Sequence, residues 1–344
     1  MNKHTFHRLR SSACAILGMA VLCLSGCGDQ RLPASTQDPI QRTDFLLNTF
    51  VDIKIYDSKD TTILDDAMAI CKDLEARFSR TLEDSEIYLM NHRSDKEQVF
   101  ELSEQTAELL SLSLNYCEQS NGSFDITIEP VSSLWDFTSG ESLLPDPLLL
   151  EDAVEKVGHE NLLLTDQTLT FLSPDTTLDL GATAKGYIAD EIKELLIERG
   201  VKSAIINLGG NVLCIGSKPN GEPFKIGLKK PFAEGSETFA IANITDMSVV
   251  TSGVYERYFE LDGKHYHHIL NPETGYPYEN GLLSVTILSN SSADGDGLST
   301  TCFSLGLEAG MELINSLDDV YGCFIDKDYN IYYSDGMEEF LNEA

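Results

Sequence analysis

The sequence predicts an α+β fold, in which a mostly antiparallel sheet forms the core and helices pack against it. Two observations favour this class. Stretches with the apolar pattern of strands follow one another closely in the second half of the chain, and helices are interspersed between them. Neither a regular series of strand–helix–strand units nor a Gly-x-Gly-x-x-Gly fingerprint occurs, which argues against a doubly wound dinucleotide-binding domain.

The first predicted elements follow from local periodicity. The stretch from Thr49 to Tyr56 alternates between apolar and polar residues, as a half-buried strand does. The next segment predicts a helix with one apolar face, made of Ile63, Ala67, Ile70, Leu74 and Phe78. Further helices are predicted at about 104–119, 151–157, 184–199, 297–305 and 308–317. Strands are predicted within 202–216, 224–228, 238–244, 255–261 and 282–289, and two short strands close the chain.

The N-terminal segment has the features of an export signal. A basic start precedes an apolar run from Ala13 to Leu24, and the sequence LSGC ends at Cys27. LSGC resembles a bacterial lipobox, in which the cysteine is lipidated; an ordinary secretory signal is the alternative. We therefore expect a signal peptide at 1–26, a polar tether at 27–43 and one large domain at 44–344, held at the membrane through Cys27 in the cell envelope.

Charge and cysteine content limit the partners. Of 24 basic residues, three lie in the signal peptide, so the remainder carries 21 basic and 56 acidic residues, a net charge of −35. Such a surface repels nucleic acid, which we exclude as a partner, and an anionic ligand would need local cations or a metal ion. Five cysteines remain beyond Cys27 at wide spacings, which predicts neither a disulfide framework nor a thiolate metal site.

The stretch LDLGATAKGY (178–187) places Lys185 in the first turn of a predicted helix. A helix start is partly positive and attracts anions, so a cation there is normally unfavourable. Lys185 would fit if a phosphate lay over the helix start; the alternative is that Lys185 pairs with Asp179 or faces solvent. The NLGGN stretch (207–211) is typical of a hairpin turn, although the glycines could also let the backbone approach a ligand.

Two later motifs carry candidate chemistry. Asp296 and Thr300 lie four residues apart in a predicted helix and therefore share one face, an arrangement that suits a hard cation such as Mg²⁺. The alternative is that Asp294 or Asp296 caps the helix. In KHYHHILNP, His265 and His267 point to one side of a strand and His268 to the other; His268 is either a general base or a hydrogen-bonded structural histidine.

The order of these stretches resembles the ApbE family, the FAD:protein FMN transferases. The resemblance covers about Phe45 to Leu317 and lies in SEIYLMN, GSFDIT, LDLGATAKGY, NLGGN, TSGVYERYF, GKHYHHILNPETG and DGLSTTCFSLG, in that order. It implies an ApbE-like (T-fold-like) architecture. Three positions differ from common family residues: Thr81 stands where an aromatic residue is frequent, and Asn211 and Asn271 stand where Asp is frequent.

The resemblance implies a role for individual residues. Mg²⁺ would be held by the carbonyl of Ala182 and by Asp296 and Thr300, and Lys185 would reach the pyrophosphate of FAD. His268 would remove the proton of the attacking hydroxyl, so His268 and Asp296 are the catalytic candidates. The remaining FAD-binding candidates are positions that match the nucleotide cleft, with Asp179 at the adenosine end: Phe50, Ser123, Phe124, Asp125, Asp179 and Leu270.

The implied reaction is transfer of FMN from FAD to a threonine hydroxyl of an acceptor protein, with release of AMP. The acceptor would carry a Ser/Thr-Gly-Ala-Thr-like segment and belong to an electron-transport complex. Two alternatives stay open: an Mg²⁺-dependent FAD pyrophosphatase that uses water as the nucleophile, and a flavin-binding lipoprotein without catalysis.

Overall fold

The computed structural model describes residues 38–343 except residues 95, 234 and 236. Its largest sheet has eight strands in the order β1-β2-β6-β7-β10-β13-β14-β15, and all neighbouring pairs are antiparallel. The strands are β1 (Ile40–Leu46), β2 (Thr49–Ile55), β6 (Ser203–Leu208), β7 (Asn211–Gly216), β10 (Ser248–Gly253), β13 (Leu282–Ser289), β14 (Tyr321–Asp326) and β15 (Ile331–Tyr333). The predicted antiparallel core is therefore confirmed.

Three smaller sheets flank this core. Their strand orders are β16-β9-β8, β3-β5-β4 and β11-β12. The strands are β3 (Val99–Glu101), β4 (Leu162–Thr165), β5 (Thr168–Phe171), β8 (Phe224–Lys229), β9 (Thr238–Ile244), β11 (Tyr258–Leu261), β12 (Lys264–His267) and β16 (Leu341–Glu343). The β3-β5-β4 sheet was not predicted, because each of its strands has only three or four residues, which is too short for the alternation of β5 to stand out.

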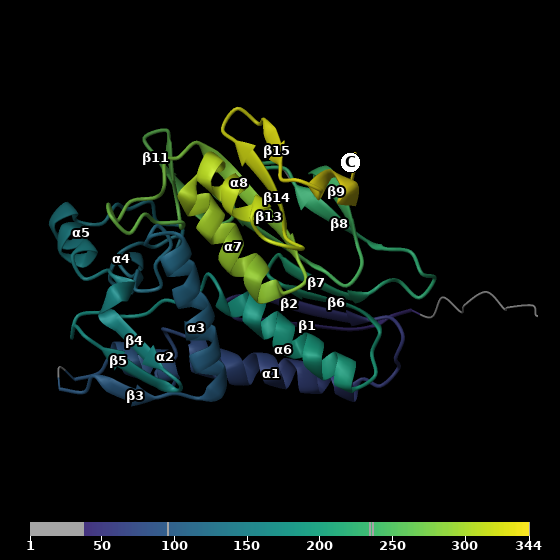
Figure 1. Ribbon diagram of the computed structural model, residues 1–344, viewed down its shortest axis with the longest axis horizontal. Coiled ribbons are helices and arrows are strands. Elements are labelled where there is room, and N and C mark those ends of the chain that lie inside the picture. Colours follow the sequence, from purple (N-terminus) through teal and green to yellow (C-terminus); the bar gives the residue numbers. More distant parts are fainter. Residues whose placement is uncertain (1–37, 95, 234, 236, 344) are drawn as a thin grey trace, which may run out of the picture. The chain divides into compact units, whose positions relative to one another are not determined.

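Helices α6 and α7 lie side by side, with α1, α3 and α8 next to them, and α4 and α5 lie apart (Figure 1). They are α1 (Thr62–Phe78), α2 (Glu86–Asn91), α3 (Glu104–Gln119), α4 (Glu129–Ser132), α5 (Pro147–Val154), α6 (Ala184–Glu198), α7 (Ser292–Leu305) and α8 (Leu307–Asn315), with 3₁₀ turns at His159–Asn161 and Met337–Phe340. α6 packs against α1 on one side and α7 on the other, and α7 covers β10 and β13. α6 therefore lies centrally between elements that are far apart in sequence.

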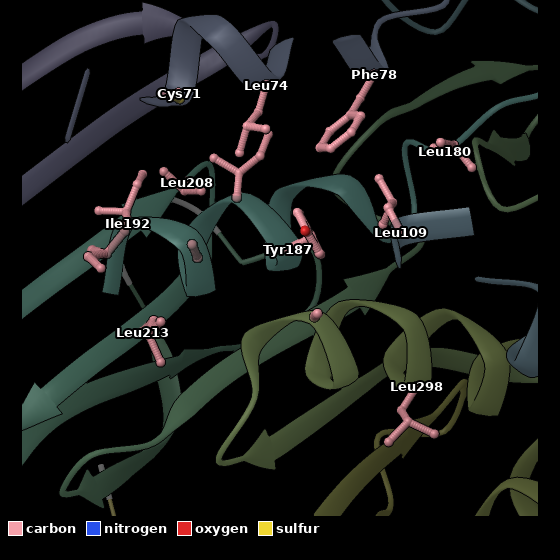
Figure 2. Packing of buried hydrophobic residues seen from close by; sticks show 14 of the residues in the cluster. Cys71, Leu74, Phe78, Leu109, Leu180, Tyr187, Ile192, Leu208, Leu213 and Leu298 are labelled. Atoms are coloured by element: carbon pink, nitrogen blue, oxygen red, sulfur yellow. The ribbon is translucent and has the colours of Figure 1, made fainter. Parts of the chain in front are cut away.

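The main apolar core joins α1 and α6 to the large sheet. Figure 2 shows Leu74 and Phe78 of α1 pointing towards α6, which carries Tyr187 and Ile192. The rings of Phe78 and Tyr187 meet edge to face at 5.7 Å. Truncating a buried side chain such as Phe78 to alanine would cost about 3–5 kcal/mol of stability. This packing fixes the start of α6, where Lys185 lies.

Two predicted boundaries in the first half of the chain were wrong. β1 begins at Ile40, so residues 40–43 belong to the sheet and not to a tether; Ile40 pairs with Ile55 of β2. The strand was missed because its half-buried face carries Arg42 and Asp44, so apolar and polar residues do not alternate along it. α5 begins at Pro147 rather than near Glu151, since Asp146 caps it and proline is well accommodated in the first turn.

The expectations about the cell envelope concern residues that lie largely outside the structure. The signal peptide, the lipidation of Cys27 and most of the tether lie outside the described residues. Within residues 38–343, the helices lack the length and apolar character that a membrane span requires. The five cysteines beyond Cys27 are all buried and unpaired, in agreement with their prediction as small apolar residues.

Candidate functional site

The lysine motif and the Asp-x-x-x-Thr motif meet in the fold. Lys185 Nζ lies 3.1 Å from the carbonyl oxygen of Gly181 and 3.3 Å from Asp296 Oδ1. The N–H of Gly186 donates to Asp296 Oδ2 at 2.9 Å. Asp296 is only 5 % exposed, so its charge needs the compensation that Lys185 and this N–H provide. The partner of Lys185 is therefore Asp296 and not Asp179, the partner in the simplest alternative.

The start of α7 explains why Asp296 is available. Ser291 caps this helix, because its hydroxyl accepts the N–H of Asp294, so the idea that Asp294 or Asp296 provides the cap is wrong. α7 begins at Ser292, five residues before the predicted start, since two glycines masked the helix. One of them is required there: a Cβ on Gly297 would lie 2.3 Å from the ring of Tyr116.

Thr300 lies one turn after Asp296 and its hydroxyl is held by a residue of the sheet. Thr300 Oγ1 lies 2.9 Å from the hydroxyl of Ser252 in β10, which also contacts Ser299 Oγ at 2.9 Å. Sequence reasoning missed Ser252, although it stands in the TSGVYERYF stretch. Ala182 directly follows Gly181 in the loop before α6, and it is half-buried.

Asp294 is engaged elsewhere. The buried hydroxyl of Tyr116 in α3 donates to Asp294 Oδ1 at 2.5 Å. Burial raises the pKa of Tyr116, and the adjacent carboxylate adds to this effect, so the tyrosine stays a donor. Asp296 is thus the carboxylate of α7 that contacts the lysine motif, while Asp294 ties α7 to α3.

The three histidines have different surroundings. His265 is exposed and stacks on Phe232, with ring centroids 4.9 Å apart. His267 is buried, and its Nε2 lies 3.0 Å from the carbonyl oxygen of Tyr278. His268 Nδ1 lies 3.3 Å from the carbonyl oxygen of Arg257, and this arrangement assigns the ring proton to Nδ1 and leaves the lone pair on Nε2.

His268 is neutral at physiological pH. Burial lowers its pKa to about 3, and the positive charges of Arg257, His267 and Lys185 act in the same direction. It can therefore accept a proton at any pH near neutrality, although its affinity for the proton is low.

Glu256, next to Arg257, is within electrostatic reach of both Lys185 and Asp296. Glu256 and Arg257 were not predicted as site residues, because neither belongs to a pattern that indicates a role.

Asp179 forms a second polar group before α6. Its Oδ1 accepts the N–H of Gly181 at 3.0 Å, while Oδ2 accepts the hydroxyl of Ser132 at 2.9 Å and lies 3.2 Å from Arg80 Nε. Arg80 also reaches Glu129 at 3.4 Å. Arg80 was not predicted as a site residue, because it follows a helix whose only signal was its apolar face.

The GSFDIT stretch contributes mainly to the fold. The carbonyl oxygen of Ser123 accepts the hydroxyl of Tyr278 at 2.6 Å, and Phe124 is buried against Tyr116. Asp125 is buried as well: Oδ1 accepts the N–H and hydroxyl of Thr127, and Oδ2 accepts the N–H and Nδ1 of His159. The carboxylate of Asp125 thus links its own turn, through Thr127, to the segment that begins at His159.

Within the described residues, one cluster of side chains has metal-ligand chemistry: Cys117, Asp125 and His159, whose ligand atoms lie within 4.8 Å of one another. It does not suit Mg²⁺. Burial raises the pKa of the Cys117 thiol, which is therefore protonated, and a thiol sulfur and an imidazole nitrogen are not the oxygen ligands that Mg²⁺ takes. Asp296 and Thr300 offer a carboxylate and a hydroxyl oxygen, and Lys185 links Asp296 to the carbonyl of Gly181 in the loop before α6; oxygens of this kind fit a magnesium ion.

Phe50 and Leu270 lie in different environments. Phe50 is 68 % exposed at the β1–β2 turn, and its carbonyl oxygen accepts the N–H of Gly209. Leu270 is 8 % exposed in a small apolar cluster with Trp135 and Phe259. The NLGGN stretch is the hairpin between β6 and β7, as predicted.

The positions that depart from the family pattern have local partners. The Asn211 Oδ1 accepts the hydroxyl of Ser292, which ties the β6–β7 hairpin to α7. Asn271 Oδ1 accepts the N–H of Glu273 in a turn, and the hydroxyl of Thr81 lies 3.2 Å from that of Ser79.

Comparisons with known proteins agree with this architecture. The ApbE family model matches residues 47–325. A protein of Klebsiella pneumoniae (strain 342) named FAD:protein FMN transferase is 35 % identical over 291 residues, which cover 84 % of this chain and 90 % of the relative. One with the same name from Treponema pallidum (strain Nichols) is 29 % identical and covers 93 % of both chains.

Solved structures show the same fold. The ApbE protein from Thermotoga maritima superposes with a TM-score of 0.80 at 29 % identity, covering 89 % of this chain and 100 % of that one. The flavin transferase ApbE from Vibrio cholerae superposes with a TM-score of 0.78 at 25 % identity, covering 88 % and 99 %. The match extends over nearly the whole described domain and includes both motifs that meet at Lys185. This chain belongs to the ApbE family.

Proposed function

We propose that this protein transfers FMN from FAD to a threonine hydroxyl of an acceptor protein and releases AMP. One observation carries the proposal: Lys185 and Asp296, from motifs 111 residues apart, are in contact beside the start of α6. An acidic protein of this charge can hold a diphosphate only where cations are concentrated. The family relatives named above carry the same activity in their names.

The binding roles follow from the contacts. Asp296 and Thr300, with the carbonyl of Ala182, would hold Mg²⁺, which neutralises the diphosphate and the charge that develops on it during transfer. Ser252 orients the Thr300 hydroxyl. Lys185 is tied to Asp296 in the free protein, and its flexible amine can turn to phosphate oxygens when FAD is bound. Asp179, with Arg80 and Ser132, would face the adenosine end.

The chemical step is displacement at phosphorus. The threonine oxygen forms a new bond to the FMN-side phosphorus, and the bond from that phosphorus to the bridging oxygen breaks, so AMP leaves with the bridging oxygen. The hydroxyl proton goes to Nε2 of His268, whose Nδ1 is fixed by the carbonyl of Arg257. Lys185 stabilises the negative charge that grows on the departing phosphate.

Export and anchoring form the second part of the proposal. We infer from the LSGC sequence that Cys27 is lipidated, which would tether the domain to a bacterial membrane on its outer side. Acceptors would then be envelope proteins with a Ser/Thr-Gly-Ala-Thr-like segment.

One experiment separates transfer from its alternatives. The protein is incubated with FAD, MgCl₂ and a purified acceptor domain that carries such a segment, beside a variant acceptor with the threonine replaced by alanine. In-gel flavin fluorescence on the threonine acceptor alone supports the proposal. Free FMN and AMP without labelled acceptor would show a pyrophosphatase, and bound, unchanged FAD would show a storage protein.

A further inference from the structure

The starts of α6 and α7 are capped by each other's carboxylates. Thr183 precedes α6 without a side-chain capping bond, and the N–H of Gly186 in the first turn donates to Asp296 of α7 instead. In the opposite direction, the N–H groups of Ser292 and Ala293 donate to Oδ1 and Oδ2 of Asp190 in α6, each at 2.9 Å. Each helix thus supplies the acceptor that the other helix start lacks.

Asp190 completes the start of α7. The Ser291 hydroxyl donates to Asp190 Oδ2 at 3.0 Å and accepts the N–H of Asp294 at 3.1 Å. The N–H of Gly295 already pairs with the carbonyl of Ser291. The N–H groups of the first turn therefore all have partners, and two of them depend on a side chain of another helix.

The two helices cannot slide easily past each other at this point. Gly186 and Asp190 lie four residues apart on α6, and Ser292 and Asp296 lie four apart on α7, so each pair shares one face. The backbones are so close that a Cβ on Gly186 would lie 2.2 Å from the carbonyl oxygen of Ser292. Asp296 and Asp190 thus hold α7 at points one turn apart on α6.

We propose that Asp190 is a positioning residue for the metal-binding carboxylate, an inference that rests on the proposed function. By fixing the start of α7 against α6, Asp190 sets Asp296 beside the lysine motif before FAD or metal arrives. Without the hydrogen bonds of Asp190, metal binding must also order this helix start, and the cost of that ordering lowers the affinity for the metal. The apolar residues that pack α6 against α1 and the sheet are other ones, so we expect the fold to persist while metal affinity falls.

The test measures Mg²⁺-dependent FAD binding rather than turnover alone. Asp190→Asn keeps the shape of the side chain but loses the charge and one of the two acceptors. We expect the Mg²⁺ concentration for half-maximal quenching of FAD fluorescence to rise about tenfold, while transfer at saturating Mg²⁺ stays within about threefold of wild type. A purely structural role would lower the melting temperature and leave the Mg²⁺ midpoint unchanged, which would overturn the inference.

Asp146→Asn is the matched control. Asp146 caps α5 by accepting the N–H groups of Leu148 and Leu149, and α5 carries none of the site residues. It should lower the melting temperature without moving the Mg²⁺ midpoint. If Asp190→Asn does not fold, Ser291→Ala is tested instead, since it removes one of the three hydrogen bonds to Asp190. A shift of the Mg²⁺ midpoint of about threefold supports the inference. An unchanged midpoint overturns it.

Amide hydrogen exchange in the substrate-free protein separates this inference from the proposed function. Asp190→Asn should speed exchange at Gly186 as well as at Ser292 and Ala293, because the two caps act together. Faster exchange at Gly186 in a protein that does not bind FAD would refute the proposed function and leave the positioning role intact. Unchanged exchange at Gly186, with FAD binding present in the wild type, would refute the positioning role alone.

Discussion

Asp296→Asn is the most direct test of the site. The substitution keeps the shape of the side chain and one oxygen that can accept the N–H of Gly186, but it removes the charge that pairs with Lys185. A hydrogen bond to a charged group contributes about 1.5–3 kcal/mol, so we expect a loss of stability of that order in the free protein. Thermal unfolding would measure it as a decrease in melting temperature of several degrees.

The effect on ligand binding should be larger. Asp296 is the one charged residue of the proposed magnesium site, so its neutralisation should weaken Mg²⁺-dependent FAD binding at least about 100-fold, or about 2.7 kcal/mol. The assay titrates MgCl₂ against FAD and follows flavin fluorescence, and then measures labelling of the acceptor. Turnover should fall below detection at Mg²⁺ concentrations that saturate the wild type.

Asp294→Asn provides the comparison on the same helix. It removes the same charge two residues earlier, where the carboxylate accepts the hydroxyl of Tyr116. It should reduce stability with little change in Mg²⁺ dependence. The assignment of Asp296 is refuted if Asp296→Asn labels the acceptor at the wild-type rate with the wild-type Mg²⁺ requirement. If only Asp294→Asn loses Mg²⁺-dependent labelling, Asp294 is the metal ligand instead.

Three further predictions concern other parts of the chain. His268→Ala should bind FAD with near wild-type affinity but lose transfer at least about 100-fold; equal transfer rates would remove His268 from the mechanism. Burial lowers the pKa of His267 to about 4, so the unfolded chain binds more protons than the folded one between about pH 4 and 6.5, and stability should decrease as pH falls through this window. Urea unfolding of His267→Gln, which keeps a donor for the carbonyl of Tyr278, should show a weaker dependence on pH; an unchanged slope contradicts this reasoning. Cys27→Ser should move the protein from the membrane fraction to the soluble envelope fraction, and continued membrane retention would argue against lipidation.

The sequence by itself determined the elements whose pattern is local. The apolar face of α1, the alternation of β2 and the apolar, β-branched stretch of β13 are all visible in short windows, because periodicity and composition act within a few residues. The ordered motifs also placed the chain in its family, since their spacing is preserved in the linear sequence. β1 and the small β3-β5-β4 sheet escaped, because β1 carries polar residues on both faces and the strands of the small sheet have only three or four residues each, so neither leaves a clear local pattern.

Only the tertiary structure decided how the site is built. Asp179 and Asp296 are both acidic residues within reach of a lysine in principle, and no local rule chooses between them; the crossing of α6 and α7 at Gly186 does. The same crossing turned Asp190, which reads as an ordinary helix-surface residue, into a cap for another helix. The contacts between the starts of α6 and α7 join residues more than about 100 positions apart, and they depend on how the core packs. The pattern of a short stretch of sequence cannot predict that packing.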